Sequence, residues 1–429
     1  MMTGLGFRPY ETYKESRVDW IGSIPSTWKV QRAKWLFKRM DRAVRPEDDI
    51  VTCFRDGEVT LRNNRRTEGF TTALKEIGYQ GIRKGDLVIH AMDAFAGAIG
   101  VSDSDGKSTP VYAACVPRLP NAVVPTFYAY YMRHLALSGF LVSLAKGIRE
   151  RSTDFRFNDF AELEVPFPPL AVQRAIVTFL DDKCTKIEEA VKIKQDQITL
   201  LRERRQIIIQ DAVTRGLNPA VPMKDSGIDW IGQIPAHWNV GPGRMCIYEN
   251  KSKNTGMLES TVLSLSYGRV IVKSEDKMTG LVPESYETYQ IIQPGDIVIR
   301  GTDLQNDVTS LRTGLARDKG IITSAYICLR SKENADSYFL HYLLHSYDAK
   351  KVFYGLGSGL RQNLSYVDFK YLAMPLPSIK EQRAIVEFLD EYCAKVDSSI
   401  AIKDHQIAAL KEYKSNLSNA AVTGKIKVV

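Results

Sequence analysis

Two short stretches of the sequence carry residue types that could do enzyme chemistry. Gly106-Lys-Ser resembles the end of a phosphate-binding loop, but Val101 stands where that loop needs its first glycine. His341 and His345 are one helical turn apart, as in a zinc-protease helix, but the glutamate of that motif is missing. We therefore interpret the first stretch as an ordinary loop glycine and the second as a histidine pair on one helix face.

The rest of the chain offers no better catalytic pattern. It contains neither the glycine-rich cofactor loop nor the proline-aromatic tetrapeptide expected of a methyltransferase. The six cysteines stand singly, without a CxxC pair, which is poor spacing for zinc and gives no disulfide framework. Scattered acidic residues form no pattern specific to a nuclease. The prediction is a chain that is not an enzyme by itself and that binds no metal or cofactor of its own.

Basic and amide side chains in loop-like segments point to a different chemistry, the binding of nucleic acid. Arg and Lys contact phosphates, and Arg, Asn and Gln make paired hydrogen bonds to base edges. Such residues gather in 61–67, in 145–157, after the strand-like segment 296–300, and in 357–365, where two glycines permit close backbone approach. A solvated charged loop or a glycine-rich connector is the alternative interpretation of each segment. The candidate DNA-binding residues are Arg62, Asn63, Asn64, Arg65, Arg66, Lys146, Arg149, Arg151, Arg300, Gln305, Arg361, Gln362 and Asn363, with His90, Asp93, Asp303 and Asn306 as weaker candidates.

Composition is compatible with this chemistry. The formal net charge is +8 and the isoelectric point is near 9.0, which favours a polyanionic partner but equally fits a mildly basic protein without one. No stretch approaches the roughly 18 apolar residues that span a bilayer, and the N-terminal residues lack the apolar core of a secretory signal. We therefore expect a cytoplasmic protein that does not contact a membrane.

The elements that must position these residues occur twice in the chain. The segment DWIGSIP returns as DWIGQIP, KGDLVI as PGDIVI, PFPPLAVQRAIVTFLD as PLPSIKEQRAIVEFLD, and Tyr131 with His134 as Tyr342 with His345. The order is kept, and the shift between copies stays within a residue or two. Such a pattern predicts a tandem duplication. The matched segments are 19–25 with 229–235, 84–89 with 294–299, and 166–181 with 375–390.

Each copy ends in a long segment with the pattern of a coiled-coil helix. After a proline-rich stop, apolar residues recur at alternating steps of four and three, which is the heptad seam of a coiled coil. Lys194 and Lys403 occupy equivalent seam positions and either fix the alignment or extend to solvent at the seam's edge. Spacing leaves parallel and antiparallel pairing open, while a pseudo-two-fold relation between the copies would make the helices antiparallel. The seam residues are Leu180, Ile187, Val191, Ile198 and Leu201, then Leu389, Val396, Ile400, Ile407 and Leu410.

The predicted fold class is α+β, with two mixed globular modules that alternate with two long helices. The first part of each copy has short β-rich runs such as 86–90 and 296–300, followed by helical periodicity around 126–145 and 337–354. Duplex DNA is a ligand that two similar modules at a fixed separation could read, because half-sites lie roughly 34–36 Å apart. The predicted boundaries are 1–170 and 216–379 for the modules, and 171–215 and 380–429 for the helices.

These motifs, in this order and twice over, resemble the specificity subunits of type I restriction-modification enzymes. The resemblance covers nearly the whole chain and rests on DWIGxIP, on G-D-[LI]-V-I, and on the P-x-P-x-x-x-x-Q-R-A-I-V-x-F-L-D transition into the helix. It implies two target-recognition domains that each read one half of a split double-stranded DNA site. It also implies an antiparallel coiled coil that spaces these domains and docks two methyltransferase subunits, which motor-nuclease subunits join. S-adenosylmethionine, ATP and Mg²⁺ would serve those partners.

A scaffold that presents two protein-binding adaptor modules on a coiled-coil spacer is the alternative function. Basicity and the resemblance argue against it, since neither is expected of such an adaptor. The bases that are read do not follow from the sequence, because 40–80 and 250–290 share little beyond Gly57 and Gly268. The spacer length of the DNA site is equally beyond what the heptads can give.

Overall fold

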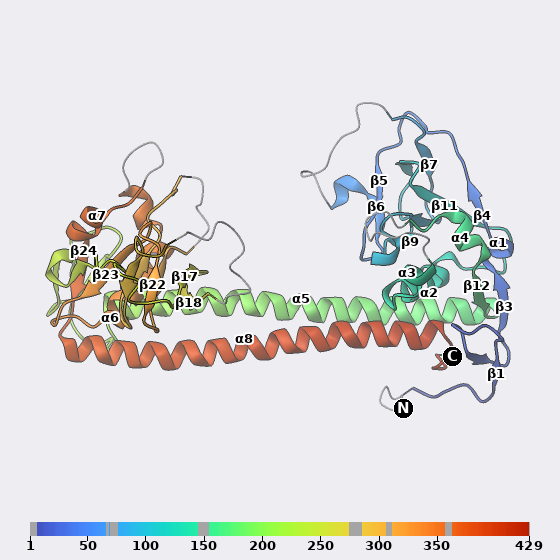
Figure 1. Cartoon of the computed structure of the whole chain (residues 1–429). Coiled ribbons are helices and arrows are strands. Elements are labelled where there is room, and N and C mark those ends of the chain that lie inside the picture. Colours follow the sequence, from blue (N-terminus) through green and yellow to red (C-terminus); the bar gives the residue numbers. More distant parts are fainter. Residues whose placement is uncertain are drawn as a thin grey trace. The chain divides into compact units, whose positions relative to one another are not determined.

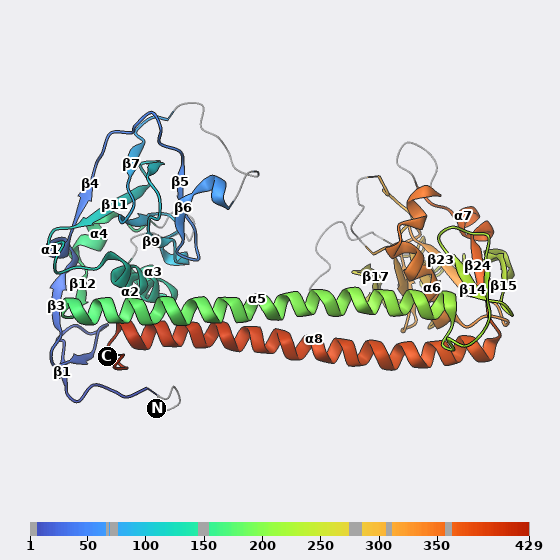
Figure 2. The same cartoon turned by 180° about the vertical axis from the view of Figure 1, so that it is seen from behind.

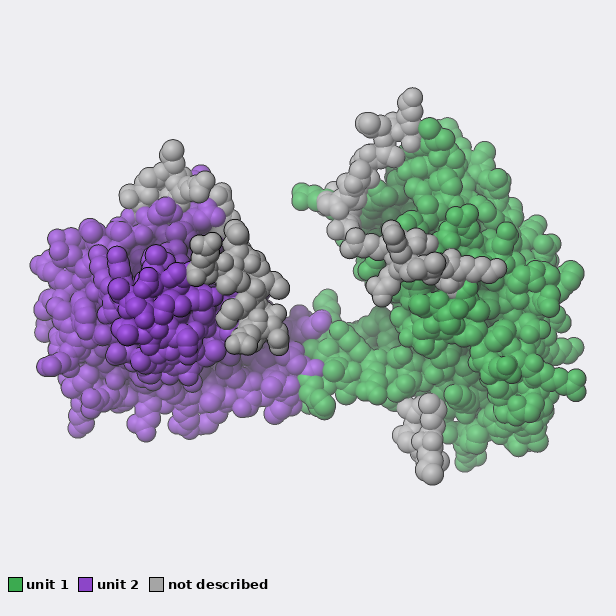
Figure 3. All heavy atoms as spheres, in the orientation of Figure 1, with its two compact units in different colours: residues 1–194, 405–429 green, residues 195–404 purple. Residues whose placement is uncertain are grey.

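The computed structural model describes residues 7–65, 68, 76–144, 154–273, 285–305, 311–356 and 363–428 (Figure 1). The chain divides into two compact units, one of residues 1–194 with 405–429 and one of residues 195–404 (Figure 3). Each unit contains one globular module and part of both long helices. No helix in the described part of the chain is long and apolar enough to cross a membrane.

The module of the first unit is built on a four-stranded antiparallel sheet in the order β4-β11-β8-β9. Short two-stranded ladders, β1-β2, β12-β3, β5-β6 and β10-β7, surround this sheet. Its elements are β1 Tyr13–Glu15, β2 Ser23–Pro25, β3 Lys29–Arg32, α1 Ala33–Leu36, β4 Phe37–Met40, β5 Val51–Cys53, β6 Val59–Leu61, η1 Arg62–Asn64, β7 Gln80–Ile82, β8 Leu87–His90, η2 Ala94–Ala96, β9 Ile99–Val101, β10 Gly106–Ser108, β11 Tyr112–Pro117, α2 Pro125–Leu137, α3 Phe140–Leu144, α4 Phe157–Glu162, β12 Glu164–Phe167 and the long helix α5 Leu170–Arg215.

The module of the second unit repeats this plan, with a four-stranded sheet in the order β16-β23-β20-β21. Its ladders β13-β14, β15-β24, β17-β18 and β19-β22 correspond to those of the first module. Its elements are β13 Met223–Asp225, β14 Gln233–Pro235, β15 Asn239–Pro242, η3 Gly243–Met245, β16 Ile247–Glu249, β17 Leu263–Ser266, β18 Arg269–Val272, β19 Gln290–Ile292, β20 Ile297–Ile299, β21 Thr313–Leu315, β22 Gly320–Ile322, β23 Ile327–Ser331, α6 Ser337–Ala349, η5 Val352–Gly355, α7 Tyr366–Tyr371, β24 Ala373–Leu376 and the long helix α8 Ile379–Val422.

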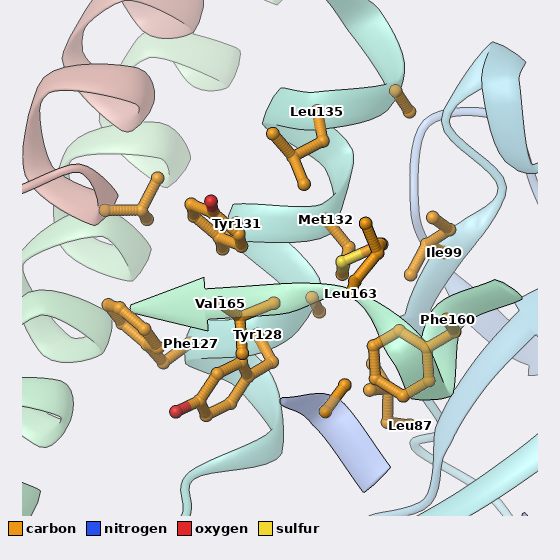
Figure 4. Close-up of a cluster of buried hydrophobic side chains, with 14 of the residues drawn as sticks. Leu87, Ile99, Phe127, Tyr128, Tyr131, Met132, Leu135, Phe160, Leu163 and Val165 are labelled. Atoms are coloured by element: carbon orange, nitrogen blue, oxygen red, sulfur yellow. The ribbon is translucent and has the colours of Figure 1, made fainter. Parts of the chain in front are cut away.

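The G-D-[LI]-V-I segments are strands buried on both faces. Leu87 and Ile89 point into the core beneath α2, while Val88 points into a second cluster beneath the β5-β6 hairpin. This alternation follows from the two-residue period of a strand, and it explains why the run is continuously apolar. Figure 4 shows the first core, in which Tyr128, Met132 and their neighbours on α2 cover the sheet.

The glycine and aspartate of the same motif form the turn before the strand. Gly85 and Gly295 have φ angles of 91° and 93°, which glycine adopts without steric cost. Asp86 accepts a hydrogen bond from the Arg83 backbone N–H at 2.8 Å, and Asp296 accepts one from Gln293 at 2.8 Å. Each buried carboxylate also pairs with an arginine, Arg42 in one case and Arg330 in the other.

The repeated DWIGxIP phrase forms a hairpin whose following tryptophan packs against the end of a long helix. Trp28 and Trp238 are buried. A Cβ atom on Gly424 would lie 3.1 Å from the Trp28 ring, and one on Gly216 would lie 3.2 Å from the Trp238 ring. Gly216 directly follows α5, and Gly424 is the second residue after the end of α8. We infer that the phrase recurs because, in each unit, the C-terminal end of one long helix packs against this hairpin and its tryptophan.

The two long helices pair in antiparallel fashion within each unit (Figures 1 and 2). In the first unit the Cys184 Sγ lies 3.8 Å from the Ser418 Oγ, and Glu188 pairs with Lys414. In the second unit Arg205 pairs with Asp397 at 2.7 Å, and the Lys403 Nζ donates to the Gln197 Oε1 at 2.7 Å. Later residues of α5 thus meet earlier residues of α8, which confirms the antiparallel coiled coil. The predicted seam residues are all buried or half-buried.

A glutamine in the proline-to-helix transition locks each module to its long helix. The Gln173 Oε1 accepts from the Val124 N–H at 2.9 Å, at the start of α2. The Gln382 Oε1 accepts from the Asp336 N–H at 2.7 Å, at the start of α6. Both glutamines also donate to a carbonyl of the proline-rich stop. The glutamine of the Q-R-A-I-V motif is therefore a buried residue that hydrogen-bonds the long helix to its module, while the rest of the motif follows the helix pattern.

The match of Tyr131 with Tyr342 at a shift of 211 residues was wrong by one position. The Tyr130 hydroxyl donates to Asp181 at 2.8 Å, and the Tyr342 hydroxyl donates to the corresponding Asp390 at 2.6 Å. Tyr130 and Tyr342 are therefore equivalent, at a shift of 212. The match of His134 with His345 was wrong as well, because at a shift of 212 His134 corresponds to Ser346. Tyrosine occupies both position 130 and position 131, and the chance spacing of the two histidines favoured the wrong shift.

Neither stretch with apparent enzyme chemistry forms a catalytic site. Gly106 lies in strand β10, paired with β7, so the prediction of a loop glycine was wrong. His341 and His345 lie on α6 with ring centroids 6.0 Å apart. Burial lowers the pKa of His341 to about 3 and that of His345 to about 4. Both rings are thus neutral core groups at neutral pH, and no metal-binding cluster occurs among the described residues.

Candidate nucleic-acid interface

In both modules the loop after the G-D-[LI]-V-I strand meets the segment that precedes the short helix α4 or α7. The Phe155 N–H donates to the Ala91 carbonyl at 2.9 Å in the first module. The Leu364 N–H donates to the Gly301 carbonyl at 2.7 Å in the second. In each copy, the described residues of two predicted DNA-binding segments, far apart in sequence, therefore lie side by side. This junction is called the recognition junction below.

The recognition junction of the second module is organised by Arg312, whose side chain is fully buried. Its guanidinium donates to the carbonyl oxygens of Thr302 at 2.8 Å, Arg300 at 3.2 Å and Asp303 at 3.2 Å. Asp303 has a left-handed φ of 59°, and its N–H donates to the Asn363 Oδ1 at 3.0 Å. One arginine thus holds three backbone carbonyls of the same loop, because the planar guanidinium presents several hydrogen-bond donors in a rigid fork.

A carboxylate and a tyrosine hold Arg312 in turn. The Asp348 carboxylate accepts a hydrogen bond from the Arg312 backbone N–H, and burial raises the pKa of Asp348 above its usual range. The guanidinium lies 5.4 Å from the Tyr354 ring centroid and donates to the Tyr354 hydroxyl at 3.3 Å. A buried cation is tolerated only with such partners, so the loop conformation and the arginine stabilise each other.

The first module uses a different arginine at its recognition junction. Arg133, from α2, donates to the carbonyls of Arg55 and Gly97, and burial lowers the pKa of Arg133. It thereby connects the tip of the β5-β6 hairpin to the loop after β8. The Arg55 side chain, 72% exposed, pairs with Asp93 at 2.9 Å. His90, beside it, has a pKa lowered by burial.

The predicted loop 61–67 lies next to this hairpin. Arg62 and Asn64 hydrogen-bond to Thr52 and Thr60, and Asn63 is exposed. Arg65 pairs with Asp56 at 2.7 Å and Glu58 at 2.9 Å, and stacks 4.2 Å from the Phe54 ring. The charge of Arg65 is therefore balanced within the module. Gln305 is exposed beside the second junction, whereas Arg66, Lys146, Arg149, Arg151, Asn306, Arg361 and Gln362 lie outside the described residues.

Sequence reasoning did not find the arginines that build the junctions. Arg312 lies in the short run LRTGL, and Arg133 lies in a helix that looked like ordinary core. Neither is flanked by another arginine or lysine, and such clustering is what pointed to the predicted candidates. The tip residue Arg55, between β5 and β6, was missed for the same reason. The matching glycines Gly57 and Gly268 could have indicated equivalent hairpin tips in the two copies, and so drawn attention to Arg55 near Gly57.

A groove of about 1090 Å³ opens in the first unit between the module and the long helices. Lys411, Lys414 and Arg133 line it together with Asp181, Glu188 and other carboxylates. Glu188 and Lys414 form an ion pair within it. Because both signs of charge are present, the groove does not have the uniform basicity of a phosphate-binding surface.

Comparison with known proteins gives one consistent family. The sequence model of the type I restriction modification DNA specificity domain matches residues 260–412. Two proteins of Methanocaldococcus jannaschii are similar: the putative type I restriction enzyme MjaX specificity subunit, 22% identical over the full length of both chains, and the MjaVIII specificity subunit, 26% identical over 72% of each.

Solved structures share the fold. A chain from a structure of a type I restriction-modification system aligns with a TM-score of 0.65 at 16% identity, covering 93% of this chain and 98% of that one. The HsdS subunit of Thermoanaerobacter tengcongensis aligns with a TM-score of 0.51 at 17% identity, covering 94% and 98%. Residues 260–412 thus match the type I restriction modification DNA specificity domain, and the chain is similar over its full length to a specificity subunit of a type I restriction enzyme.

Proposed function

We propose that each module reads one half of an asymmetric, bipartite DNA site through its recognition junction. The observation that carries this proposal is the contact, in both modules, between described residues of two predicted DNA-binding segments that are far apart in sequence. The two junctions differ in the residues that build them, with Arg133 and Arg55 in one and Arg312 in the other. Modules of one plan with different surfaces suit a target whose halves differ in sequence, which the cytoplasmic chain would meet as double-stranded DNA.

The long helices would set the spacing and dock two methyltransferase subunits, to which motor-nuclease subunits add. In the second unit, Tyr342 of the module bonds to Asp390, which follows the seam residue Leu389. The long helices of this unit also carry the side chains of Leu200, Ile207 and Ile402, which are 63%, 58% and 59% exposed. Exposed apolar side chains on a long helix, two of them seven residues apart, support a helical partner. S-adenosylmethionine, ATP and Mg²⁺ would be bound by the partners.

Methylation mapping tests the proposal directly. The chain is co-expressed with the methyltransferase subunit encoded beside it in a host without adenine methylation, and modified adenines are located across the genome. We expect one split motif, with two short half-sites and a fixed gap. A complex that forms and methylates without a split motif would contradict half-site reading. A chain that forms a complex with other proteins but binds no DNA would favour the adaptor scaffold.

Neutralising Arg149 and Arg151 together should weaken binding to the first half-site. Their segment continues into Phe155, which is hydrogen-bonded to the recognition junction. If both arginines contact phosphates, the slope of log affinity against log salt falls in magnitude by about 1.8, since each released counterion contributes about 0.9. The measurement is a salt titration of DNA binding by the methyltransferase complex, with Arg156→Gln as the neighbouring control. An unchanged slope would remove both arginines from the interface.

A further inference from the structure

The tip of the β17-β18 hairpin in the second module presents an aromatic side chain to solvent in an unfavourable backbone conformation. Tyr267 is 95% exposed and has a φ of 46°. Gly268, the next residue, has a φ of 76°. Two left-handed central residues define the tight hairpin turn for which Asn-Gly is the preferred sequence. A bulky residue at the first position costs conformational energy there.

Folding alone does not explain this tyrosine. Its ring buries almost no surface, so it returns no hydrophobic stabilisation that would offset the strain. The strands behind it are well seated, because Gly314 lies against Leu265 and Val270 of the hairpin. An asparagine at position 267 would satisfy the turn better. Strain at an exposed, rigidly held residue is typical of functional positions.

The hairpin tip lies beside the recognition junction of the second module. A Cβ atom on Gly268 would lie 3.1 Å from the Leu311 side chain and 3.6 Å from the Thr313 carbonyl. These residues flank Arg312, which fixes the loop that carries Arg300 and Asp303. Arg269, the residue after Gly268, is also exposed and lies 3.9 Å from Asp397 on α8. The hairpin tip therefore contacts α8 through Arg269 and contacts the residues on either side of Arg312 through Gly268.

In the first module, the tip of the corresponding hairpin lies at that module's own recognition junction. There Arg55, between β5 and β6, pairs with Asp93 in the loop after β8. Arg133 bonds to the backbone of both segments. Both residue types can contact the base edges of duplex DNA, arginine through hydrogen bonds and an aromatic ring through apolar contact, for example with a thymine methyl group. The two tips therefore occupy equivalent positions with different chemistry.

We propose that Tyr267 lays its ring against the exposed edge of a base in the second half-site, as an apolar contact that contributes to recognition. This inference rests on the proposed function. The strained turn holds the ring at a fixed place, so little rotational freedom is lost when DNA binds.

Substitution by asparagine separates the functional contact from folding. Tyr267→Asn removes the ring and relieves the turn, so we expect thermal stability to rise slightly while affinity for the complete site falls about tenfold. Tyr267→Phe keeps the ring and should bind like the wild type. Tyr338→Asn, at the far end of α6 from Asp348, is the control for losing an exposed tyrosine. All variants are purified as the complex with the methyltransferase subunit.

The binding assay uses two duplexes, one with both mapped half-sites and one with the second half-site scrambled. The Tyr267→Asn complex should bind the complete duplex more weakly than the wild-type complex does. On the duplex with the scrambled second half-site, the two complexes should bind almost equally. Equal losses on both duplexes, unchanged affinity, or failure of the variant to assemble with the methyltransferase would each overturn the base contact. If the wild-type complex itself does not distinguish the two duplexes, the proposed function fails instead.

Discussion

Replacing Trp238 with alanine will lower the free energy of unfolding of the second unit by about 3–5 kcal/mol, the range for removing a large buried aromatic side chain. For a unit of this size the loss corresponds to a melting temperature roughly 10 °C lower. The Trp238 ring is buried and lies against Gly216, directly after α5. Its Nε1 donates to the Glu381 Oε1 at 3.2 Å, near the start of α8. One side chain thus joins an end of each long helix.

The carboxylate that Trp238 contacts is strongly held in its charged form. Burial alone would raise the pKa of Glu381, but hydrogen bonds from His237, Ser378 and Trp238 outweigh it and bring the pKa to about 2. A carboxyl group with a lowered pKa stabilises the folded state above its unfolded pKa and loses that contribution as pH falls. The destabilisation by Trp238→Ala should therefore be complete at neutral pH.

Circular dichroism melts and amide exchange at the end of α5 measure the effect of Trp238→Ala. Exchange should accelerate around Ile209 and Val213, which share the core with Trp238. Trp35→Ala is the matched control, because the Trp35 side chain is 62% exposed, and it should change stability by less than about 0.5 kcal/mol. A loss below about 1 kcal/mol for Trp238→Ala would contradict the role of the hairpin as a helix seat.

The long helices could be predicted from sequence because their pattern is local and repeated. Heptad steps from Leu180 to Ala212 recur 209 residues later, and a seam of this length fits no strand or loop. The predicted start at 171 and the observed start at Leu170 differ by one residue. Antiparallel pairing could not follow from spacing alone, since it depends on contacts between residues over 190 positions apart, such as Arg205 with Asp397.

The interior of each module was predicted less well, because its elements are short and its contacts are distant. Most strands have three or four residues, too few for a period-two pattern to be distinguished from chance. The buried Arg312 is the clearest case, since burial of an arginine is unfavourable unless several carbonyls surround it. Those carbonyls belong to a loop about ten residues away whose conformation no sequence pattern specifies. Charge clustering identified exposed candidates and missed the residue that positions them.

Replacing Arg312 with alanine should strongly weaken the preference for the second half-site while leaving reading of the first half-site intact. Three carbonyl groups of the loop 300–303 would lose their donor, and each unsatisfied buried group costs about 1–3 kcal/mol. We expect the loop to change conformation, so that the hydrogen bond from the Asp303 N–H to the Asn363 Oδ1 is lost. Because a good base contact provides about 1–3 kcal/mol of discrimination, losing one such contact predicts a preference for the second half-site that is weaker by roughly 10- to 100-fold.

The conservative variant separates positioning from charge. Arg312→Lys keeps the positive charge but not the planar fork, so it should lose nearly as much half-site preference as alanine if geometry is what matters. Arg133→Ala is the matched control in the first module, where it should reduce preference for the first half-site only. Preferences are measured with methyltransferase complexes on duplexes scrambled in either half. If Arg312→Lys retained full preference, or if both variants weakened both half-sites equally, Arg312 would act through charge or general stability, because a residue that positions one loop affects one half-site.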